Sequence, residues 1–402
     1  MSCGHERVRD SCNRKVVMTF QITRIDSLAE LAHLQAEWEE LQADSQSQSI
    51  FLSWEWVSAY LHCLNPEAEL WILLARDRDQ HLLGLAPLML EKVQLTGPLR
   101  ARRLQFIALE YDKHYTSFII RKGCEEVVIA AFIAWLREHR VWDDVLLEGI
   151  PAESPVTDAL IQSGPSWIKL ESHDYPYVST TQAWEAHYAS LSKSKREAQR
   201  RAWRKLDADF PDQWSWKRIE DPAELPVAMD RLMDLHQQKW VTLGEDGHYR
   251  DEQSRAFHHH IARRFLERGW LRLYQLTIKG EVVSADYAFA YMGRIYGYAR
   301  AMDDAYRPYA LGNVLTEIAL REAFEEGMAE FDLLWGAHEY KLRWGSEIRG
   351  TLVLSWPTAP LMLLYRHGYQ VARELWIRAK GVFRADKQAW MQAILPLMLL
   401  WD

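Results

Sequence analysis

One segment of the chain combines a loop, the start of a helix and polar side chains that could bind an anion. It runs from Ala305 to Gly345 and contains "RPYALGN" directly before an apolar-periodic helix. The first turn of a helix has backbone N–H groups without partners and lies at the positive end of the helix dipole, which suits a phosphate or pyrophosphate. Gly312 would allow close approach of the backbone, and a turn glycine without a ligand is the alternative.

Carboxylates in and near this segment could act as a general base toward an amine. The candidates are Asp286, Asp303, Asp304, Asp332 and Glu339. A carboxylate close to a bound nucleophile can remove its proton during attack. Asp286 lies in the strand-like "VVSADYAF", where it is either partly buried or outward and solvated. Asp332 in "EFDLL" has a structural role as its alternative.

Two neighbouring residues after the helix could complete the chemistry. The hydroxyl of Tyr340 could protonate a leaving group, and Lys341 could neutralise the charge of a phosphate or carboxylate. An ordinary amphipathic helix with an exposed lysine is the alternative.

The elements that would position these residues follow the same plan in both halves of the chain. Each half shows a meander of extended segments, then a helix, a strand and a second helix. Lys279-Gly280 and Met292-Gly293 are the tight turns between three strands upstream of the loop. The sequence therefore predicts a mixed α/β fold, with a mixed, mostly antiparallel sheet flanked by helices in each half.

The same patterns predict four segments. Residues 1–17 form a disordered extension, 18–180 a first domain, 181–356 a second domain that carries the site, and 357–402 a helical C-terminal segment. The polar helical region from Trp184 to Asp209 connects the two domains.

Composition excludes several classes of function. The 402 residues carry a net charge of −8, which argues against a DNA-binding protein. Four scattered cysteines without a Cys-x-x-Cys pair give little support for a disulfide framework or a zinc site and favour the cytoplasm. No run of about 18 apolar residues predicts a transmembrane helix, while the C-terminal "ILPLMLLW" leaves peripheral membrane contact open. His258, His259 and His260 point about 100° apart on a helix, so we expect no metal.

The order of the motifs resembles a known family. A hairpin, a strand, Tyr-x5-Gly, a helix, Phe-Asp-x3-Gly and Glu-Tyr-Lys are similar to the C-terminal half of the BioF2-like/CelD acetyltransferases, which belong to the GNAT superfamily and are related to the FemAB aminoacyltransferases. "IFLSWEWVSAYL", "LLGLAPLML", "LSKSKREAQRRAWRKL" and "LMDLHQQKW" resemble further family motifs, so the resemblance covers about Phe20 to Trp356. It implies tandem GNAT-like domains, of which the first is degenerate and the second catalytic.

The resemblance also implies an activity and a set of residues. The expected enzyme is an N-acyltransferase that uses acyl-CoA, no metal and an amine acceptor on a small molecule or glycan, in exopolysaccharide or cell-envelope metabolism. The residues expected to bind acyl-CoA are Tyr298, Ala299, Arg300, Ala301, Pro308, Tyr309, Ala310, Leu311, Gly312 and Asn313. The catalytic candidates are Asp286, Asp332, Glu339, Tyr340 and Lys341. The acceptor-binding candidates are Trp54, His236 and Trp240, with a packed core position as the alternative for His236.

Two other functions remain open at this point. One is a Fem-like aminoacyl transferase that uses aminoacyl-tRNA, and the other is a non-catalytic partner of a polysaccharide synthesis complex. The basic helix that contains Lys193–Lys205 could bind the 3′-phosphate of CoA, an anionic lipid, a sugar polymer or tRNA, or present a solvated face without a ligand.

Overall fold

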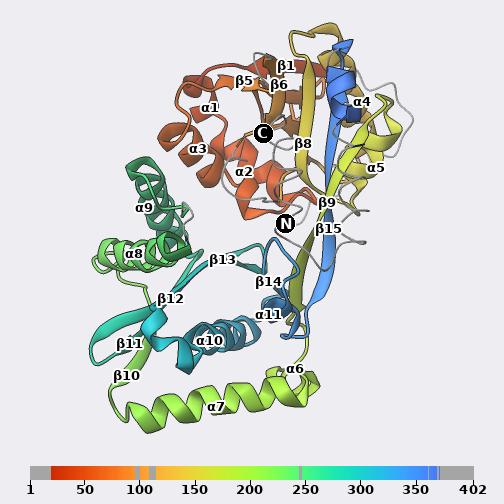
Figure 1. Ribbon diagram of the computed structural model, residues 1–402. Coiled ribbons are helices and arrows are strands. Elements are labelled where there is room, and N and C mark those ends of the chain that lie inside the picture. Colours follow the sequence, from red (N-terminus) through yellow and green to blue (C-terminus); the bar gives the residue numbers. More distant parts are fainter. Residues whose placement is uncertain are drawn as a thin grey trace, which may run out of the picture.

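The computed structural model describes residues 20–95, 100–107, 115–243, 247–360, 362–368 and 371. Figure 1 shows the N-terminal half above and the C-terminal half below. Two long strands, β9 (Ile168–Ser179) and β15 (Glu347–Pro357), run from one half to the other.

The N-terminal half has helices on both sides of short and medium-length strands. Its elements are β1 (Gln21–Ile25), α1 (Leu28–Ala32), α2 (Gln35–Ala43), η1 (Ile50–Leu52), α3 (Trp54–Cys63), β2 (Glu69–Leu70), β3 (Ile72–Arg76), β4 (Leu82–Ala86), β5 (Leu88–Gln94), β6 (Arg100–Phe106), β7 (Ile119–Ile120), α4 (Glu125–Glu138), β8 (Asp144–Pro151), α5 (Pro155–Gln162) and β9.

The C-terminal half contains the elements that form the candidate site. They are α6 (Trp184–Ser190), α7 (Lys193–Asp209), β10 (Trp214–Arg218), α8 (Leu225–Leu243), α9 (Glu252–Glu267), β11 (Leu271–Ile278), β12 (Glu281–Tyr291), β13 (Arg294–Met302), η2 (Asp304–Tyr309), α10 (Leu311–Glu325), β14 (Glu330–Asp332), α11 (Glu339–Leu342) and β15.

The strands form two sheets. One has four strands in the order β1-β3-β4-β7, and the other has eleven in the order β10-β11-β12-β13-β14-β9-β15-β8-β6-β5-β2. Only the pairs β13–β14 and β6–β8 are parallel among the described strands. The predicted class, mixed α/β with mostly antiparallel sheets flanked by helices, is confirmed. The structure adds that the larger sheet continues from one half into the other through β9 and β15.

The predicted hairpins of the C-terminal half are present. Lys279 and Gly280 have φ values of 53° and 81°, and Met292 and Gly293 have φ values of 46° and 79°. Two successive residues with positive φ match the twist of antiparallel strands and close tight hairpins. Apolar residues of α10 pack on one face of the β11–β13 meander, and those of α8 and α9 pack on the opposite face.

The predicted division of the chain into four segments stays a prediction. Residues 1–17 lie outside the described residues, as does most of 357–402, in which residues 362–368 are helical. β15 follows the second predicted domain's helices in the sequence, yet it pairs with β8 and β9. In the described part of the chain, none of the helices is both long and apolar enough for a membrane span.

Candidate functional site

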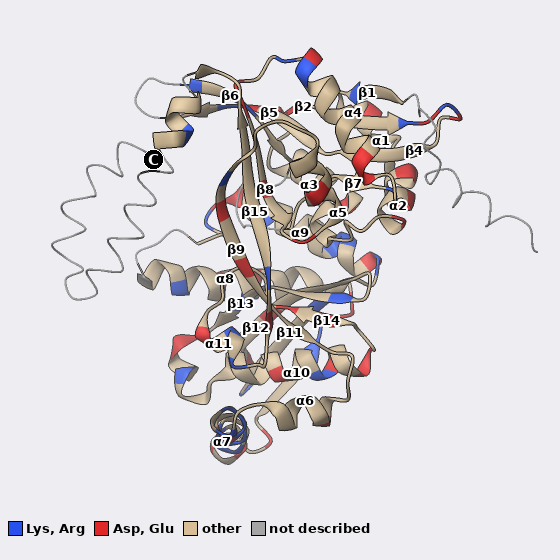
Figure 2. Ribbon diagram, turned by 90° about the vertical axis from the view of Figure 1, so that its right-hand side faces the viewer, with Lys and Arg blue, Asp and Glu red and all other residues tan. Residues whose placement is uncertain are grey.

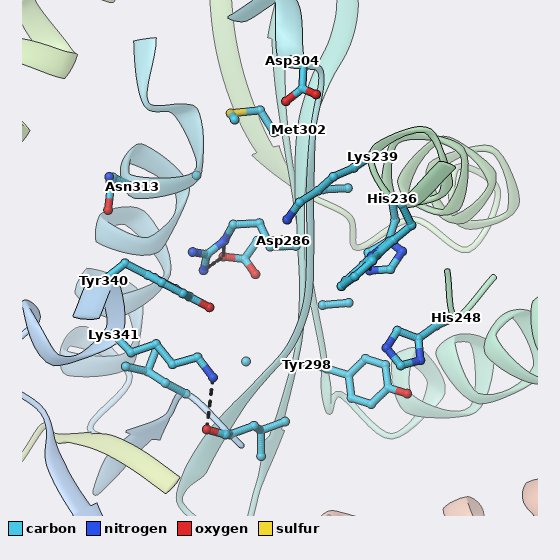
Figure 3. A pocket seen from close by; sticks show the side chains of 18 of the residues that line it. His236, Lys239, His248, Asp286, Tyr298, Met302, Asp304, Asn313, Tyr340 and Lys341 are labelled. Atoms are coloured by element: carbon cyan, nitrogen blue, oxygen red, sulfur yellow. Dashed lines mark hydrogen bonds and ion pairs between the residues drawn. The ribbon is translucent and has the colours of Figure 1, made fainter. Parts of the chain in front are cut away.

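A pocket of about 640 Å³ lies in the C-terminal half, between α8, β13, the start of α10 and the loop that follows β14. Figure 3 shows side chains from these elements facing a common space, with His236, Lys239 and His248 opposite Asn313, Tyr340 and Lys341. The pocket therefore joins residues that are far apart in the sequence.

One wall of the pocket is the edge of β13, which extends beyond the end of the neighbouring strand β14. β13 pairs in parallel with β14 only from Arg294 to Tyr296, and then β13 continues to Met302 while the chain after Asp332 turns away. No described strand pairs with this edge beyond Tyr296. The pairing of β13 with β12 also shifts register here, from Ala288–Gly297 to Tyr287–Ala299, which is a β-bulge. Gly297–Met302 line the pocket and can offer backbone hydrogen bonds to an extended ligand.

The start of α10 offers unpaired N–H groups. Ala310, the N-cap, has φ 50° and ψ 42°, and its carbonyl accepts hydrogen bonds from the N–H groups of Asn313 and Val314 at 2.8 and 3.3 Å. The N–H groups of Leu311 and Gly312 have no acceptor among the described residues. Ala310, Gly312 and Asn313 line the pocket, so its wall includes the positive end of a 15-residue helix.

The absence of a side chain at Gly312 leaves space for the side chain of Arg300, and the backbone of Gly312 itself is not in the left-handed region. The left-handed residue of this turn is Ala310. A Cβ atom on Gly312 would lie 3.0 Å from Cδ of Arg300. The aliphatic part of Arg300 therefore crosses the first turn of α10 where a side chain would otherwise be.

An ion pair forms the floor of the pocket. Asp286 and Arg300 are cross-strand neighbours in β12 and β13, and Oδ2 of Asp286 accepts hydrogen bonds from Nε and Nη2 of Arg300 at 3.1 and 2.6 Å. Asp286 is 1% exposed. Its Oδ1 accepts no hydrogen bond from the described residues, so this oxygen can still receive a proton.

Tyr340 and Lys341 follow the loop after β14 and differ in their surroundings. Figure 3 shows Tyr340 pointing toward Asp286. Desolvation raises the pKa of the Tyr340 hydroxyl, with a smaller opposing effect from Arg300, so the hydroxyl stays protonated at neutral pH. Lys341 is buried and donates hydrogen bonds to the carbonyls of Leu334 and Trp335 at 3.2 and 2.6 Å. Its ammonium group thus stabilises the loop.

The opposite wall is formed by α8. His236 is 6% exposed, and its Nε2 accepts a hydrogen bond from Nε1 of Trp240 at 3.1 Å. Burial, His248 and Lys239 together lower the pKa of His236 to about 3. The ring is therefore neutral at physiological pH and carries its proton on Nδ1.

Several candidates from the sequence lie outside the pocket wall. Trp54 is buried at the start of α3, with its ring centroid 5.9 Å from that of Trp38. Asp332 is fully buried behind the loop, where Oδ2 accepts a hydrogen bond from Tyr115 at 2.7 Å and burial raises its pKa to about 6. Glu339 is exposed and forms an ion pair with Arg343.

Three of the residues predicted to bind acyl-CoA also lie outside the pocket wall. Leu311 is buried in the core below α10, and the hydroxyl of Tyr309 donates a hydrogen bond to Asp209 at 2.9 Å. Pro308 is exposed and does not line the pocket. Asp303, a candidate general base, also lies outside the pocket wall, where its side chain caps the short helix η2 by accepting a hydrogen bond from the N–H of Ala305.

Sequence reasoning missed several residues that line the pocket. They are Lys239, Thr242, His248, Tyr249, Arg307, Leu333, Leu334 and Trp335. Lys239 could have been found, because it lies three residues after His236 on the same helix. Arg307 lies inside the quoted "RPYALGN" segment. The other positions depend on how α8 and the loop after β14 meet β13.

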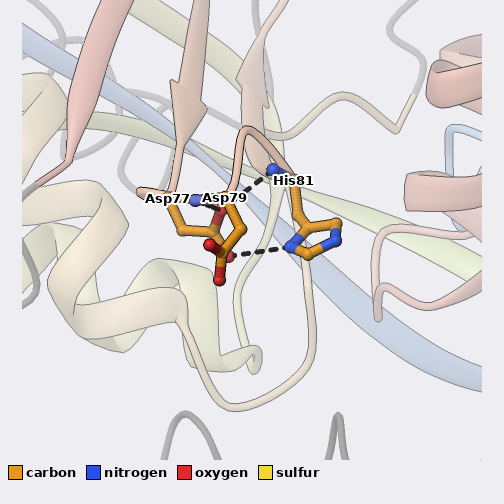
Figure 4. A group of neighbouring side chains, drawn as sticks. All are labelled: Asp77, Asp79 and His81. Carbon is orange, nitrogen blue, oxygen red and sulfur yellow. Dashed lines mark hydrogen bonds and ion pairs between the residues drawn. The ribbon is translucent and has the colours of Figure 1, made fainter.

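One group of side chains in the N-terminal half has the spacing of a metal site. Asp77, Asp79 and His81 lie in the turn between β3 and β4 (Figure 4). Oδ1 of Asp77 accepts hydrogen bonds from the N–H groups of Asp79 and His81, both at 2.9 Å, and Oδ2 lies 3.2 Å from Nδ1 of His81. These contacts stabilise the turn, and nothing else in the described structure points to an ion there.

The basic helix of the sequence is α7, which packs along α10. Figure 2 shows its Lys and Arg residues at the lower end of the molecule. Lys193, Arg200, Arg201 and Arg204 are exposed, whereas Lys195 is only 6% exposed. α7 therefore has an outward cationic face and one lysine that points inward.

Comparisons with known proteins agree with the predicted fold. Residues 193–342 match the model of the acetyltransferase (GNAT) domain family. A search of the curated proteins finds no match. The crystal structure of FemX has a TM-score of 0.61 and 11% identity, over 86% of this chain and 100% of that chain.

Two further solved structures have lower TM-scores. L-PGS from Bacillus licheniformis matches with a TM-score of 0.51 and 12% identity, over 85% of this chain and 95% of that chain. A conserved protein of unknown function from Bacteroides thetaiotaomicron VPI-5482 has a TM-score of 0.51 and 12% identity, over 84% of this chain and 100% of that chain.

Proposed function

From a fold of the GNAT superfamily that is related to the FemAB proteins, we propose that this chain transfers an acyl group from acyl-CoA to a primary amine. One observation carries the proposal: the open edge of β13 and the free N-terminus of α10 meet in a single pocket. An acyl-CoA donor has an extended amide-containing arm followed by a pyrophosphate, so its two parts match these two features.

The donor would bind along the strand and the helix start. The amides of the pantetheine arm would exchange hydrogen bonds with the backbone of Gly297–Met302. The pyrophosphate would accept hydrogen bonds from the N–H groups of Leu311 and Gly312, with Arg300 and Arg307 nearby to neutralise its charge. Pro308, Tyr309 and the side chain of Leu311 take no part, because they lie outside the pocket wall.

The reaction would be a direct attack of the amine on the thioester. As the amine nitrogen bonds to the carbonyl carbon, its proton passes to Oδ1 of Asp286, which Arg300 leaves without a partner. The C–S bond then breaks and the thiolate sulfur takes the proton of the Tyr340 hydroxyl. Lys341 would keep the loop beneath Tyr340 in place rather than contact phosphate.

The acceptor would enter from the α8 side. His236, Lys239 and Trp240 of α8 line the pocket. Figure 3 shows His236 and Lys239 opposite Asn313 at the start of α10. Their ring faces and polar atoms suit a small molecule or glycan that carries an amine. The resemblance to the CelD family supports a role in exopolysaccharide or cell-envelope metabolism.

Ligand-induced stabilisation tests the proposal. The protein is mixed with acyl-CoAs of increasing chain length, with free pantetheine and with adenosine 3′,5′-bisphosphate, and its thermal midpoint is measured. A donor at 100 times its Kd adds about 2.7 kcal/mol to the free energy of unfolding. We expect complete CoA species to raise the midpoint more than either fragment. No stabilisation by any CoA species would refute the proposal.

The Fem-like alternative is supported by the TM-score with FemX and by the cationic face of α7. If aminoacyl-tRNA is the donor, RNase treatment abolishes transferase activity and CoA does not stabilise the fold. If the protein is a non-catalytic partner of a polysaccharide synthesis complex, amine acylation is absent with every donor tested.

A further inference from the structure

We propose that Lys195 of α7 is a positioning residue for the donor site, which orients Asn313 and makes binding of the anionic donor take up a proton. This inference rests on the proposed function, because it concerns the pocket that would hold the pyrophosphate. Lys195 does not line that pocket; it acts through the first turn of α10.

The contact between the two residues is direct. Nζ of Lys195 donates hydrogen bonds to Oδ1 of Asn313 at 3.1 Å and to Oε1 of Gln199 at 3.4 Å. Because Oδ1 of Asn313 accepts from the lysine, Nδ2 of the same amide is left as a donor without an acceptor among the described residues. Asn313 lines the pocket (Figure 3), so Lys195 turns its amide into a donor for an anion.

The surroundings of α7 keep Lys195 in this position. Nε2 of Gln199 donates hydrogen bonds to the carbonyl of Asn313 at 3.1 Å and to Glu317 at 2.8 Å, and Nε1 of Trp203 donates to Glu317 at 3.0 Å. These bonds tie α7 to the first two turns of α10. Nζ of Lys195 also lies 3.5 Å from the centroid of the Trp344 ring.

The protonation state of Lys195 near neutral pH depends on burial and on nearby charges. Burial lowers its pKa to about 7; Arg300 of β13 and Arg343 after α11 act in the same direction, and Glu317 of α10 opposes them. A pyrophosphate at the start of α10 adds negative charge close to these groups, which opposes the effect of burial and raises the pKa of Lys195 in the bound form. Near pH 7 the bound form therefore carries more protons than the free form.

Linkage gives the sign of the pH effect. Since the donor binds the protonated form more tightly, its affinity is highest below pH 7 and falls as pH rises through 7. The fall cannot exceed tenfold per pH unit for one proton, and we expect up to about tenfold between pH 7 and 8.5.

Calorimetric titration of CoA tests the proposal. Kd is measured from pH 6.5 to 8.5, and proton uptake is obtained by comparing buffers that differ in ionisation enthalpy. Lys195→Met should weaken CoA binding and reduce both the proton uptake on binding and the pH dependence of Kd. Lys195→Arg should still bind CoA, but without the proton uptake that we attribute to Lys195. Lys193→Met is the matched control, because Lys193 is exposed on the same helix, and it should titrate like the wild type.

Each result has a distinct meaning. If Lys195→Met takes up as many protons as the wild type and keeps its pH profile, the inference is wrong while the proposed function stands. Absence of CoA binding in the wild type refutes the proposed function instead. Should Lys195→Met fail to fold, Lys195→Arg decides alone: proton uptake equal to that of the wild type would overturn the inference.

Discussion

Substitution of Gly312 by alanine separates donor binding from folding. The new Cβ atom would lie 3.0 Å from Cδ of Arg300, whereas ordinary contacts begin at 3.4 Å. The stem of Arg300 must therefore move by about 0.4 Å or more, which is the difference between these two distances. The guanidinium then shifts relative to Asp286 and to the N-terminus of α10.

Gly312→Ala should weaken donor binding but leave the free energy of unfolding nearly unchanged. A hydrogen bond to a charged group contributes about 1.5–3 kcal/mol, and loss of about half of such a contact to the donor weakens binding roughly tenfold. Alanine is favoured over glycine within a helix by about 1 kcal/mol, which offsets the strain of the displaced side chain. We therefore expect a tenfold higher Kd for CoA and a free energy of unfolding within about 1 kcal/mol of the wild type.

A double-mutant cycle identifies the route of the effect. Kd for CoA is measured by calorimetry, and stability by urea unfolding, for Gly312→Ala, Arg300→Met and the double mutant. If Gly312 acts through Arg300, the double mutant binds about as weakly as Arg300→Met alone. Additive losses, or unchanged affinity in Gly312→Ala, would refute this reasoning. Gly312→Glu should abolish binding, because it adds negative charge at the same position.

Two further predictions concern proton transfer and stability. Asp286→Asn and Tyr340→Phe should each lower kcat by about 100-fold or more while CoA still raises the thermal midpoint, and normal turnover in both would exclude the assigned roles. Burial holds the pKa of His236 at about 3 in the folded protein, below the ordinary histidine value of about 6.5. Unfolding then takes up a proton below pH 6.5, so the free energy of unfolding decreases as the pH is lowered, by about 1.6 kcal/mol between pH 6.5 and 5. Urea unfolding of the wild type and of His236→Leu at both pH values measures this loss, and an equal loss in the two proteins would contradict it.

Local patterns in the sequence predicted the elements around the pocket. The paired turn residues at Lys279-Gly280 and Met292-Gly293 predicted the β11–β13 meander, and the loop before Leu311 predicted the start of α10. These features depend on residues close together in the chain, for which backbone preferences decide the structure.

Features that depend on distant contacts could not be predicted in this way. Nothing in "EFDLL" indicates that Asp332 would be buried and accept a hydrogen bond from Tyr115, which lies more than 200 residues earlier in the sequence. Likewise, Lys193 and Lys195 look equivalent in the sequence, and only the phase of α7 against α10 makes one exposed and the other buried. The role of Gly312 depends on the path of the Arg300 side chain from a neighbouring strand.

The position of β15 has a consequence for the nascent chain. β15 lies between β8 and β9, both of which precede residues 193–342, the segment that matches the GNAT domain model. During synthesis the backbone edges of β8 and β9 that face β15 stay unpaired until residues from Glu347 onward have left the ribosome. Unpaired strand edges invite association with other chains. The larger sheet, which connects the two halves, is thus completed only by β15, the last described strand.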